Sequence, residues 1–145
     1  MIHYRVGEVA VEEAREVYRS CTLGARRPVD DDTRFVQMLR GANLIVSAWN
    51  ENQIVGIARS LTDGSYVTYV ADLAVRESHQ RMGIGRELLR RTRLEVPLAQ
   101  LVLFAAPQAI EYYEKIGFTR HASGWVLQPD QSLGRRKACN RVLGV

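Results

Sequence analysis

The sequence predicts a single α/β (α+β) domain in which helices pack on the faces of a mixed β-sheet. Segments with the alternating or wholly apolar pattern of strands recur along the chain, and segments with helical spacing of apolar residues lie between them. Their predicted order is β α α β β β α β α β β, which is typical of a sheet covered by helices. A chain of 145 residues, 46% of them hydrophobic, is long enough to bury the core of one domain.

The first half of the chain contains one predicted strand, two helices and three further strands. Residues 2–8 alternate like a strand, and residues 11–20 carry apolar side chains at helical spacing. Residues 30–43 begin with three aspartates, which favour a helix N-terminus, and reach Gly41 where a glycine commonly ends a helix. Hairpin and turn signals then separate three predicted strands, at residues 43–50, 53–61 and 66–75.

The second half begins with a glycine-containing turn. After it, residues 85–96 predict a helix with leucines along one side. Residues 100–106 are a wholly apolar run, which favours a buried strand. Residues 107–118 begin with a proline and reach a glycine near their end, as a short helix does. Residues 119–129 predict a final hairpin with a Ser-Gly turn.

The net charge of +4 comes from the end of the chain. Residues 131–145 carry four basic residues and no acidic one, which leaves 16 basic against 16 acidic residues in the rest. We therefore expect one domain over residues 1–130 and a short basic C-terminal tail over residues 131–145. Because the tail lacks interleaved aromatic residues, it is a weak electrostatic footprint for nucleic acid, which is disfavoured as a partner.

The two cysteines, Cys21 and Cys139, lie far apart and lack CxxC spacing. We expect reduced thiols and neither a disulfide framework nor a metal site. No apolar run reaches the roughly 18 residues of a membrane helix, so no membrane partner is expected. The first residues lack the basic-then-apolar layout of a signal peptide, which favours a cytoplasmic location.

The turn QRMGIGR, at residues 80–86, joins a predicted strand to a predicted helix. A helix N-terminus exposes unpaired N–H groups and partial positive charge, and glycine lets an anion approach that backbone closely. A side chain at Gly83 or Gly85 would occupy the ligand's place, while Arg81 and Arg86 can contact phosphate oxygens. The turn lacks a complete GxGxxG fingerprint and a Walker lysine, so the glycines alone leave a purely steric role open.

Residues 72–89, DLAVRESHQRMGIGRELL, followed by residues 103–118, LFAAPQAIEYYEKIGF, resemble the general N-acetyltransferase (GNAT) superfamily. The family signature is a strand end of the L-x-V type, a Q/R-x-x-G-x-G/A turn, an amphipathic helix and a later A-x-x-x-Y-E-K-x-G-F helix. Both parts occur here in order, and the resemblance extends over nearly all of residues 2–130. It implies an N-acetyltransferase domain with a mostly antiparallel sheet, helices on both faces and two splayed parallel strands, here residues 69–75 and 100–106.

The resemblance also implies a binding site for acetyl-CoA. Backbone N–H groups of the turn would hold the pyrophosphate, together with side chains of the same residues: Gln80, Arg81, Met82, Gly83, Ile84, Gly85 and Arg86. The backbone of the preceding strand end would pair with the pantetheine arm and polarise the thioester carbonyl, through Leu73, Ala74 and Val75. The reaction that the family carries out needs no metal.

Two residues are candidates for catalysis. Tyr113 matches the tyrosine that commonly protonates the departing thiolate in the family, and an ordinary tyrosine is acidic enough for this step. The structural alternative is that Tyr113 packs its helix on the sheet. Strand alternation places Asp72 on the face opposite Ala71 and Leu73. Asp72 could bind or deprotonate a cationic amine, or it could instead pin a loop.

Two positions depart from the family pattern. Ala106 stands where many members have an asparagine that holds the coenzyme arm, and Ala71 stands where many have a glutamate that acts as a base through water. The aspartates at 30–32 either cap a helix or attract a basic acceptor. Weaker candidates on the acceptor side are Tyr66, Tyr69 and Glu77.

We therefore expect an enzyme that uses acetyl-CoA to acetylate the primary amine of a small molecule or peptide by direct attack. One alternative is a protein that binds acetyl-CoA as a sensor without turnover. Another is a nucleic-acid- or protein-binding module that uses the basic tail. A homodimer is also compatible with the family. The sequence carries no pattern that identifies the acceptor or the general base.

Overall fold

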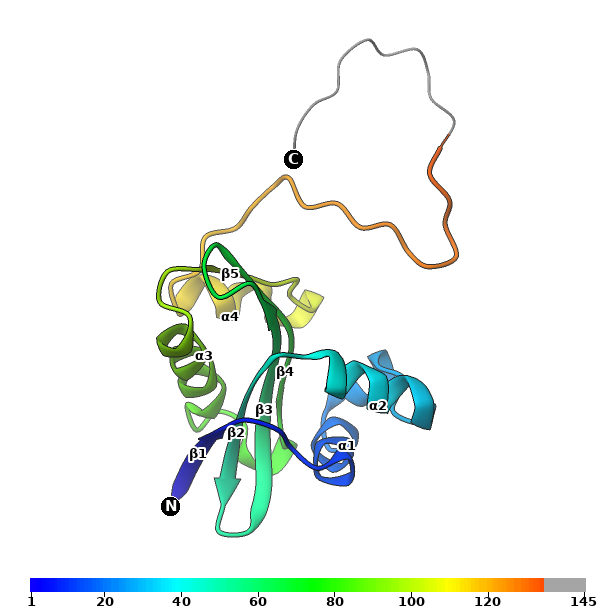
Figure 1. Cartoon of the computed structure of the whole chain (residues 1–145). Coiled ribbons are helices and arrows are strands. Elements are labelled where there is room, and N and C mark those ends of the chain that lie inside the picture. The colour runs from blue at the N-terminus through cyan, green and yellow to red at the C-terminus, as the bar shows by residue number, and fades with distance from the viewer. Residues whose placement is uncertain (135–145) are drawn as a thin grey trace. The chain divides into compact units, whose positions relative to one another are not determined.

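A computed structural model describes residues 1–134 of the chain (Figure 1), which fall into a first unit, Met1–Ala109, and a second unit that begins at Ile110. The first unit contains the sheet and three long helices. The basic residues of the predicted tail and Cys139 lie outside the described residues, so the predicted domain boundary at residue 130 stays a prediction. The elements of the first unit are β1 (Ile2–Val6), α1 (Val11–Arg19), η1 (Thr22–Arg26), α2 (Asp32–Gly41), β2 (Leu44–Asn50), β3 (Gln53–Thr62), β4 (Val67–Val75), η2 (Glu77–His79), α3 (Ile84–Glu95), β5 (Gln100–Val102) and η3 (Pro107–Ala109).

The five strands form one sheet in the order β1-β2-β3-β4-β5. The first four strands pair in an antiparallel manner, and β5 pairs with β4 in parallel. The parallel connection from β4 to β5 runs through α3, as parallel strands require a long crossover. The predicted mixed, mostly antiparallel sheet is confirmed.

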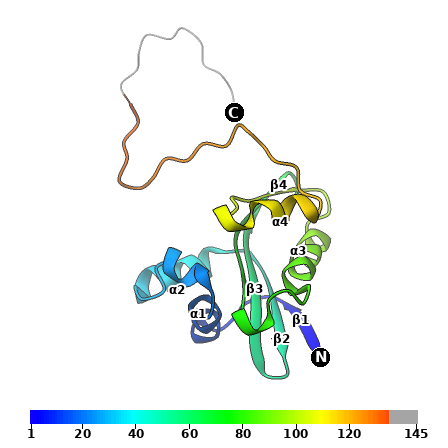
Figure 2. The same cartoon turned by 180° about the vertical axis from the view of Figure 1, so that it is seen from behind.

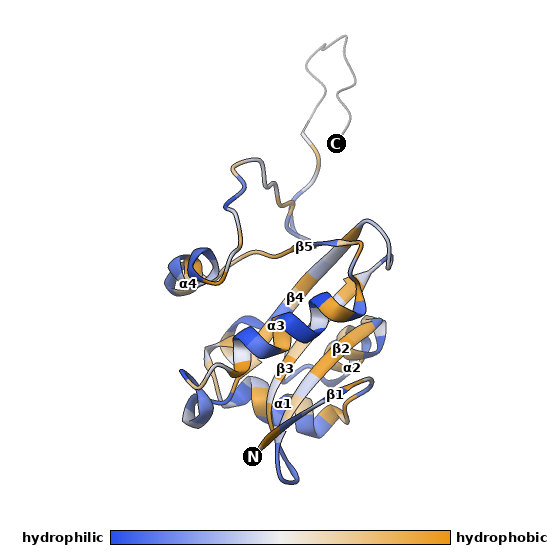
Figure 3. Ribbon diagram, turned by 90° about the vertical axis from the view of Figure 1, so that its left-hand side faces the viewer, coloured by the Kyte–Doolittle hydropathy of each residue, from blue (hydrophilic) through white to orange (hydrophobic). Residues whose placement is uncertain are grey.

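Helices cover both faces of this sheet: α1 and α2 lie on one side and α3 on the other (Figures 1 and 2). Because side chains alternate along a strand, β2 supplies Ile45 and Trp49 to the core beneath α1 and α2, and Val46 and Ala48 to the core beneath α3. Figure 3 shows apolar residues along the strands behind α3, while the outer side of this helix is polar. The strands β2 and β3 are therefore buried on both faces of the sheet.

A glycine on β3 brings the start of α3 close to the sheet. A Cβ atom at Gly56 would lie 3.1 Å from Leu88 Cδ1, 3.2 Å from the Ala74 carbonyl oxygen and 3.3 Å from Ile84 Cγ2. These separations are tighter than ordinary van der Waals contact. The absence of a side chain at this position thus sets how closely the first turn of α3 packs on β3 and β4.

The parallel pairing of β4 with β5 covers only three residue pairs, from Val67 with Gln100 to Tyr69 with Val102. Beyond Tyr69, β4 continues to Val75 with β3 on one side and no strand on the other among the described residues. The predicted opening between these two strands is confirmed. The prediction of a fully buried strand over residues 100–106 is wrong, because β5 lies at the sheet edge, ends at Val102 and is followed by Phe104, which is 58% exposed.

The second unit contains α4 (Ile110–Lys115), followed by a turn at Gly117 with a φ of 106°. The predicted hairpin over residues 119–129 is wrong, because these residues contain turns and no strand. Its apolar side chains bury little surface: Trp125 is 92% exposed, and Val126 and Leu127 are exposed as well. A hairpin without a buried face has little to stabilise it.

Candidate active site

The turn before α3 leaves backbone N–H groups available at the start of a helix. Its N-cap residue, Gly83, has a left-handed φ of 80° and provides no side-chain cap. The first intrahelical bond runs from the Glu87 N–H to the Gly83 carbonyl oxygen at 3.0 Å. The N–H groups of Ile84, Gly85 and Arg86 precede it and have no intrahelical acceptor. Together with the positive end of the helix dipole, they form an anion-binding geometry.

The turn is open to solvent, as the predicted pyrophosphate site requires. Arg81, Met82 and Gly83 are exposed, and no atom lies within 4 Å of where a Cβ of Gly83 would stand. Arg81 has a φ of 62°, a left-handed conformation that costs a non-glycine residue about 1 kcal/mol or more. Ile84 differs from the others, since its side chain is only 2% exposed and anchors the turn in the core beneath α3.

Two arginines supply positive charge at the turn. Arg81 and Arg86 are exposed, and neither makes an ion pair within residues 1–134. Arg90 and Arg91, one turn further along α3, both pair with Glu87 at 2.7 and 2.8 Å. A hydrogen bond from Arg90, aided by one from Arg91, lowers the pKa of Glu87 to about 2, so this carboxylate stays charged. The cations available to an incoming phosphate are therefore Arg81 and Arg86.

The strand end that precedes the turn has no neighbouring strand, among the described residues, on the side away from β3. Leu73 and Val75 are half-buried against the core beneath α3, whereas Ala74 belongs to the core on the opposite face. The Gln80 side-chain amide donates a hydrogen bond to the Val75 carbonyl at 3.0 Å, which ties the turn to the strand. The backbone groups of Leu73–Val75 that point away from β3 face the gap left by β5.

Asp72 lies at the centre of a buried polar network. Its side chain is 0% exposed, and it accepts hydrogen bonds from Arg27 Nε at 2.5 Å, Arg59 Nε at 2.6 Å and the Tyr18 hydroxyl at 2.7 Å. As predicted from strand alternation, it lies on the same sheet face as Ala74, toward α1 and α2. In this arrangement the carboxylate has no exposed atom that could contact an amine substrate. Its contacts instead join β4 to α1, to β3 and to the loop after η1.

The ionisation of the groups around Asp72 reflects their burial. Burial and the nearby Asp72 carboxylate raise the pKa of Tyr18 well above its usual value, so its hydroxyl stays protonated and donates. Burial opposes the charge of Arg59, but the contact with Asp72 more than offsets it, and the pKa of Arg59 is raised. Sequence reasoning missed Tyr18, Arg27 and Arg59. The available signal was an arginine at position 59, in the middle of an otherwise apolar strand.

Tyr113 belongs to the second unit. It lies on α4, where its ring contacts Tyr112 and Phe118 edge-on at centroid separations of 5.3 and 5.6 Å. The Phe118 N–H donates to the Tyr113 carbonyl at 3.0 Å and closes the end of the helix. The aromatic neighbours fix the orientation of the Tyr113 ring within this unit.

The aspartates at 30–32 are all engaged. Asp30 pairs with Arg19 at 2.6 Å, and Asp32 pairs with Arg15 at 2.5 Å. Asp31 is the N-cap of α2 and accepts a hydrogen bond from the Arg34 N–H at 3.1 Å, which confirms the capping interpretation for this residue. The ion pairs of the other two aspartates reduce the negative charge available to a basic acceptor.

Other candidate chemistry is sparse. Burial raises the pKa of the Cys21 thiol, which disfavours a reactive thiolate. Among residues 1–134, no group of three or more His, Cys, Asp or Glu side chains is placed to hold a metal ion. No helix in this part of the chain is long and apolar enough to cross a membrane.

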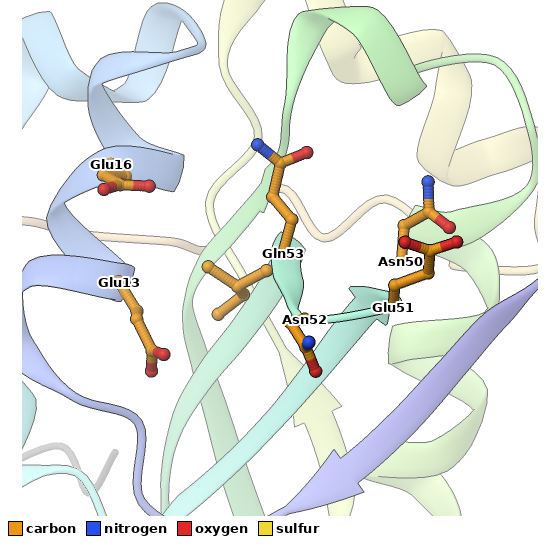
Figure 4. A pocket seen from close by; sticks show the side chains of 7 residues that line it. Glu13, Glu16, Asn50, Glu51, Asn52 and Gln53 are labelled. Carbon is orange, nitrogen blue, oxygen red and sulfur yellow. The ribbon is translucent and has the colours of Figure 1, made fainter.

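Two of the surface hollows in the first unit bear on where a phosphate could bind. The larger, of about 530 Å³, is open and lined mostly by acidic and amide side chains of α1 and the β2–β3 hairpin, among them Glu13, Glu16 and Gln53 (Figure 4). The smaller, of about 370 Å³, is lined by Cys21, Glu77 and Gln80 together with neighbouring residues at the end of α1. Only the smaller of these two hollows borders the glycine turn, so the larger one is a poor candidate for the phosphate site.

The sheet opens beside an uncapped helix start that contains two glycines, as the resemblance noted in the sequence implies. The pattern of the acetyltransferase (GNAT) domain family matches residues 41–120, which is more than half of the chain. The chain therefore belongs to the GNAT acetyltransferase family. The match includes β4, the turn and α3, whereas α1 and all of α2 except its last residue lie before it.

Sequence relatives and solved structures agree with this family. The chain is 27% identical over 94 residues to an uncharacterized N-acetyltransferase, ycf52, of Porphyra purpurea, covering 59% of this chain and 53% of that protein. It is 29% identical over 77 residues to the histone acetyltransferase TAP1 of Glycine max, covering 51% and 33%. The chain thus spans about half or less of the length of these relatives.

Among solved structures, a GNAT-family acetyltransferase from Streptococcus pneumoniae TIGR4 has a TM-score of 0.72 at 22% identity, covering 90% of this chain and 100% of that one. An aminoglycoside acetyltransferase from an uncultured soil metagenomic sample has a TM-score of 0.64 at 20% identity, covering 92% and 97%. At these identities the likeness shows the shared fold.

Proposed function

We propose that this protein is an N-acetyltransferase that takes the acetyl group from acetyl-CoA and transfers it to a primary amine. The observation that carries the proposal is the uncapped N-terminus of α3 directly beside the unpaired end of β4. The N–H groups of Ile84, Gly85 and Arg86 fit a pyrophosphate, and Arg81 and Arg86 add charge without competing ion pairs in the described part of the chain. Acetyl-CoA supplies an acetyl group as a thioester.

We assign each step of the proposed reaction to a group of the chain or to water. Phosphate binding at the turn directs the thioester toward the gap beside β4, where N–H groups of Leu73–Val75 stabilise negative charge on the carbonyl oxygen. The amine nitrogen forms a bond to the carbonyl carbon, and the carbon–sulfur bond breaks. Water takes the proton from the amine, and the Tyr113 hydroxyl gives one to the leaving sulfur. The burial and pairing of Asp72 support a structural role for it better than the role of a base.

The acceptor belongs to the class of primary amines, on a small molecule or a peptide. The histone and aminoglycoside acetyltransferases among the compared proteins carry names that cover both kinds. The pairing of Asp30 and Asp32 with arginines gives little support to strong attraction of a polycation. A cytoplasmic location, no use of a metal, and possible homodimerisation remain parts of this proposal.

Binding and turnover are tested separately. The melting temperature of the full chain is measured with and without acetyl-CoA, and CoA release is measured with a panel of primary amines. We expect both a rise in melting temperature and release of CoA with some amines. A protein that binds but never releases CoA is a sensor, and one that neither binds nor reacts refutes the proposal. Salt-sensitive DNA retention that is lost on deleting residues 131–145 would instead favour the basic-tail module.

Tyr113→Phe tests the proton donor. It keeps the ring contacts with Tyr112 and Phe118 and removes the hydroxyl, so it should lower kcat by about tenfold to a thousandfold while leaving acetyl-CoA affinity nearly unchanged. Tyr112→Phe, on the preceding residue of α4, is the matched control and should retain activity. An unchanged kcat in the Tyr113 variant removes this residue from the mechanism.

A further inference from the structure

We propose that Arg27 is a positioning residue that holds the irregular part of β4 in the shape needed for acetyl transfer. This inference rests on the proposed function. Arg27 lies in the loop between η1 and α2 and contacts both the carboxylate of Asp72 and the backbone of Ala71. It therefore acts on the catalytic strand from outside that strand.

The irregularity lies at Ala71. In the pairing of β3 with β4, Arg59 is opposite Asp72 and Ser60 is opposite Val70, so Ala71 is an extra residue without a partner. Such a β-bulge bends the strand and interrupts its ladder. The parallel pairing with β5 ends at Tyr69, two residues earlier. The bulge and the opening of the sheet therefore occur together.

Arg27 supplies what the strand ladder does not. Its Nη2 donates to the Ala71 carbonyl at 3.0 Å, while its Nε donates to Asp72 at 2.5 Å. The Ala71 carbonyl and the Asp72 N–H belong to one planar peptide unit, so holding the carbonyl fixes the direction of that N–H. The planar guanidinium of Arg27 therefore holds the bulge through two hydrogen bonds, one to the Ala71 backbone and one to the Asp72 side chain.

The other hydrogen bonds of the network keep Asp72, and so its contact with Arg27, in a fixed position. Asp72 is also held by Arg59 and Tyr18, which are both buried, and Arg59 reaches the Met38 carbonyl on α2 at 3.1 Å. Arg27 is the outermost member, with 26% of its side chain exposed. Its removal therefore leaves Asp72 with one cation and one hydroxyl, and the core remains filled. Leu73–Val75 follow the bulge closely along β4, so the directions of their N–H groups depend on the shape of the bulge.

Arg27→Ala tests the inference, with Arg27→Lys and Arg26→Ala as companions. Arg26 is exposed at the end of η1, directly before Arg27, so Arg26→Ala removes one neighbouring positive charge without touching the bulge. In Arg27→Ala we expect kcat to fall about tenfold to a hundredfold, while KM for acetyl-CoA changes by less than about threefold because the glycine turn is intact. Lysine keeps the positive charge but lacks the planar guanidinium that donates to two acceptors at once. The kcat of Arg27→Lys should therefore resemble that of Arg27→Ala. Millimolar guanidinium, far below denaturing concentrations, should partly restore kcat in Arg27→Ala.

Hydrogen exchange provides a readout that does not need turnover. Backbone amides of residues 67–75 should exchange faster in Arg27→Ala than in the wild type or Arg26→Ala. Unchanged exchange with unchanged kcat overturns the inference, as does an equal loss of activity in Arg26→Ala. A wild-type protein without any turnover refutes the proposed function. In that case hydrogen exchange alone decides whether Arg27 shapes β4.

Discussion

Replacing Asp72 with asparagine separates a structural role of this residue from a catalytic one. Asparagine has nearly the same shape, but its amide is neutral and its NH₂ group would face a guanidinium donor at 2.5 or 2.6 Å. Removing one partner of a buried ion pair costs about 3–5 kcal/mol, because the remaining charge is left without compensation. Arg59, with 8% of its side chain exposed, cannot regain water, whereas Arg27 can do so in part.

We therefore expect Asp72→Asn to lower the free energy of unfolding by about 3 kcal/mol. This is a large share of the roughly 5–15 kcal/mol that stabilises a typical domain. Urea-induced unfolding, followed by circular dichroism, measures the change. Trp49 is buried in the core beneath α1 and α2 and provides a fluorescence signal from the same region. Asp30→Asn is the control, since Asp30 is 84% exposed and its ion pair should contribute less than about 1 kcal/mol.

A second variant tests the cause of the destabilisation. In Asp72→Asn the uncompensated cation is Arg59, so adding Arg59→Met should restore part of the lost stability. If Asp72→Asn unfolds within about 1 kcal/mol of the wild type but has lost turnover, the anchor interpretation is refuted and a catalytic base is favoured. If the double variant is less stable than Asp72→Asn, the charge argument is wrong.

Three further perturbations address α3. Gly56→Ala should cost about 1–3 kcal/mol in urea unfolding and weaken acetyl-CoA binding, because the new methyl group pushes against Leu88 and Ile84; full stability would contradict the close-packing argument. Gly83→Ala meets no atom within 4 Å, so its cost of about 1 kcal/mol should come from the left-handed backbone, and calorimetry should show weaker acetyl-CoA binding. Glu87→Gln should remove a pH-dependent contribution to the free energy of unfolding. Because the pKa of Glu87 is about 2 in the folded state against 4.5 in the unfolded state, the carboxylate stabilises the fold above pH 4.5 and loses this effect as the pH falls toward 2. Solvent screening limits that contribution to less than about 1 kcal/mol. If the difference in unfolding free energy between wild type and variant stays constant from pH 4.5 to pH 2, the contribution is excluded.

Local patterns predicted the elements whose signals are contiguous in the sequence. The glycine turn, its helix and the strand before it follow from residues 66–96, and the structure places them as expected. The hairpin over residues 119–129 failed because alternation describes what a strand needs, while a paired neighbour and a buried face decide whether it forms. The apolar run at 100–106 failed for a related reason, since position at a sheet edge leaves such residues exposed.

The network around Asp72 was beyond local patterns. Its three bonds join residues that are 13, 45 and 54 positions apart, so no spacing rule connects them. Alternation did place Asp72 on the correct face, but the choice between a reactive carboxylate and a buried anchor depends on partners from α1, β3 and a loop. Arg59 within an apolar strand was the one local sign that an acidic partner was needed.

The missing cap at Gly83 ties ligand binding to the folding of α3. Because no side chain accepts the first N–H groups of this helix, a bound phosphate would do so and would complete the helix. Occupancy of the turn should then raise the stability of the whole fold, by about 2.7 kcal/mol when acetyl-CoA is present at 100 times its dissociation constant. If acetyl-CoA is the donor, as we propose, the stability of this protein in the cell would follow the concentration of acetyl-CoA, and a fall in that concentration would favour unfolding.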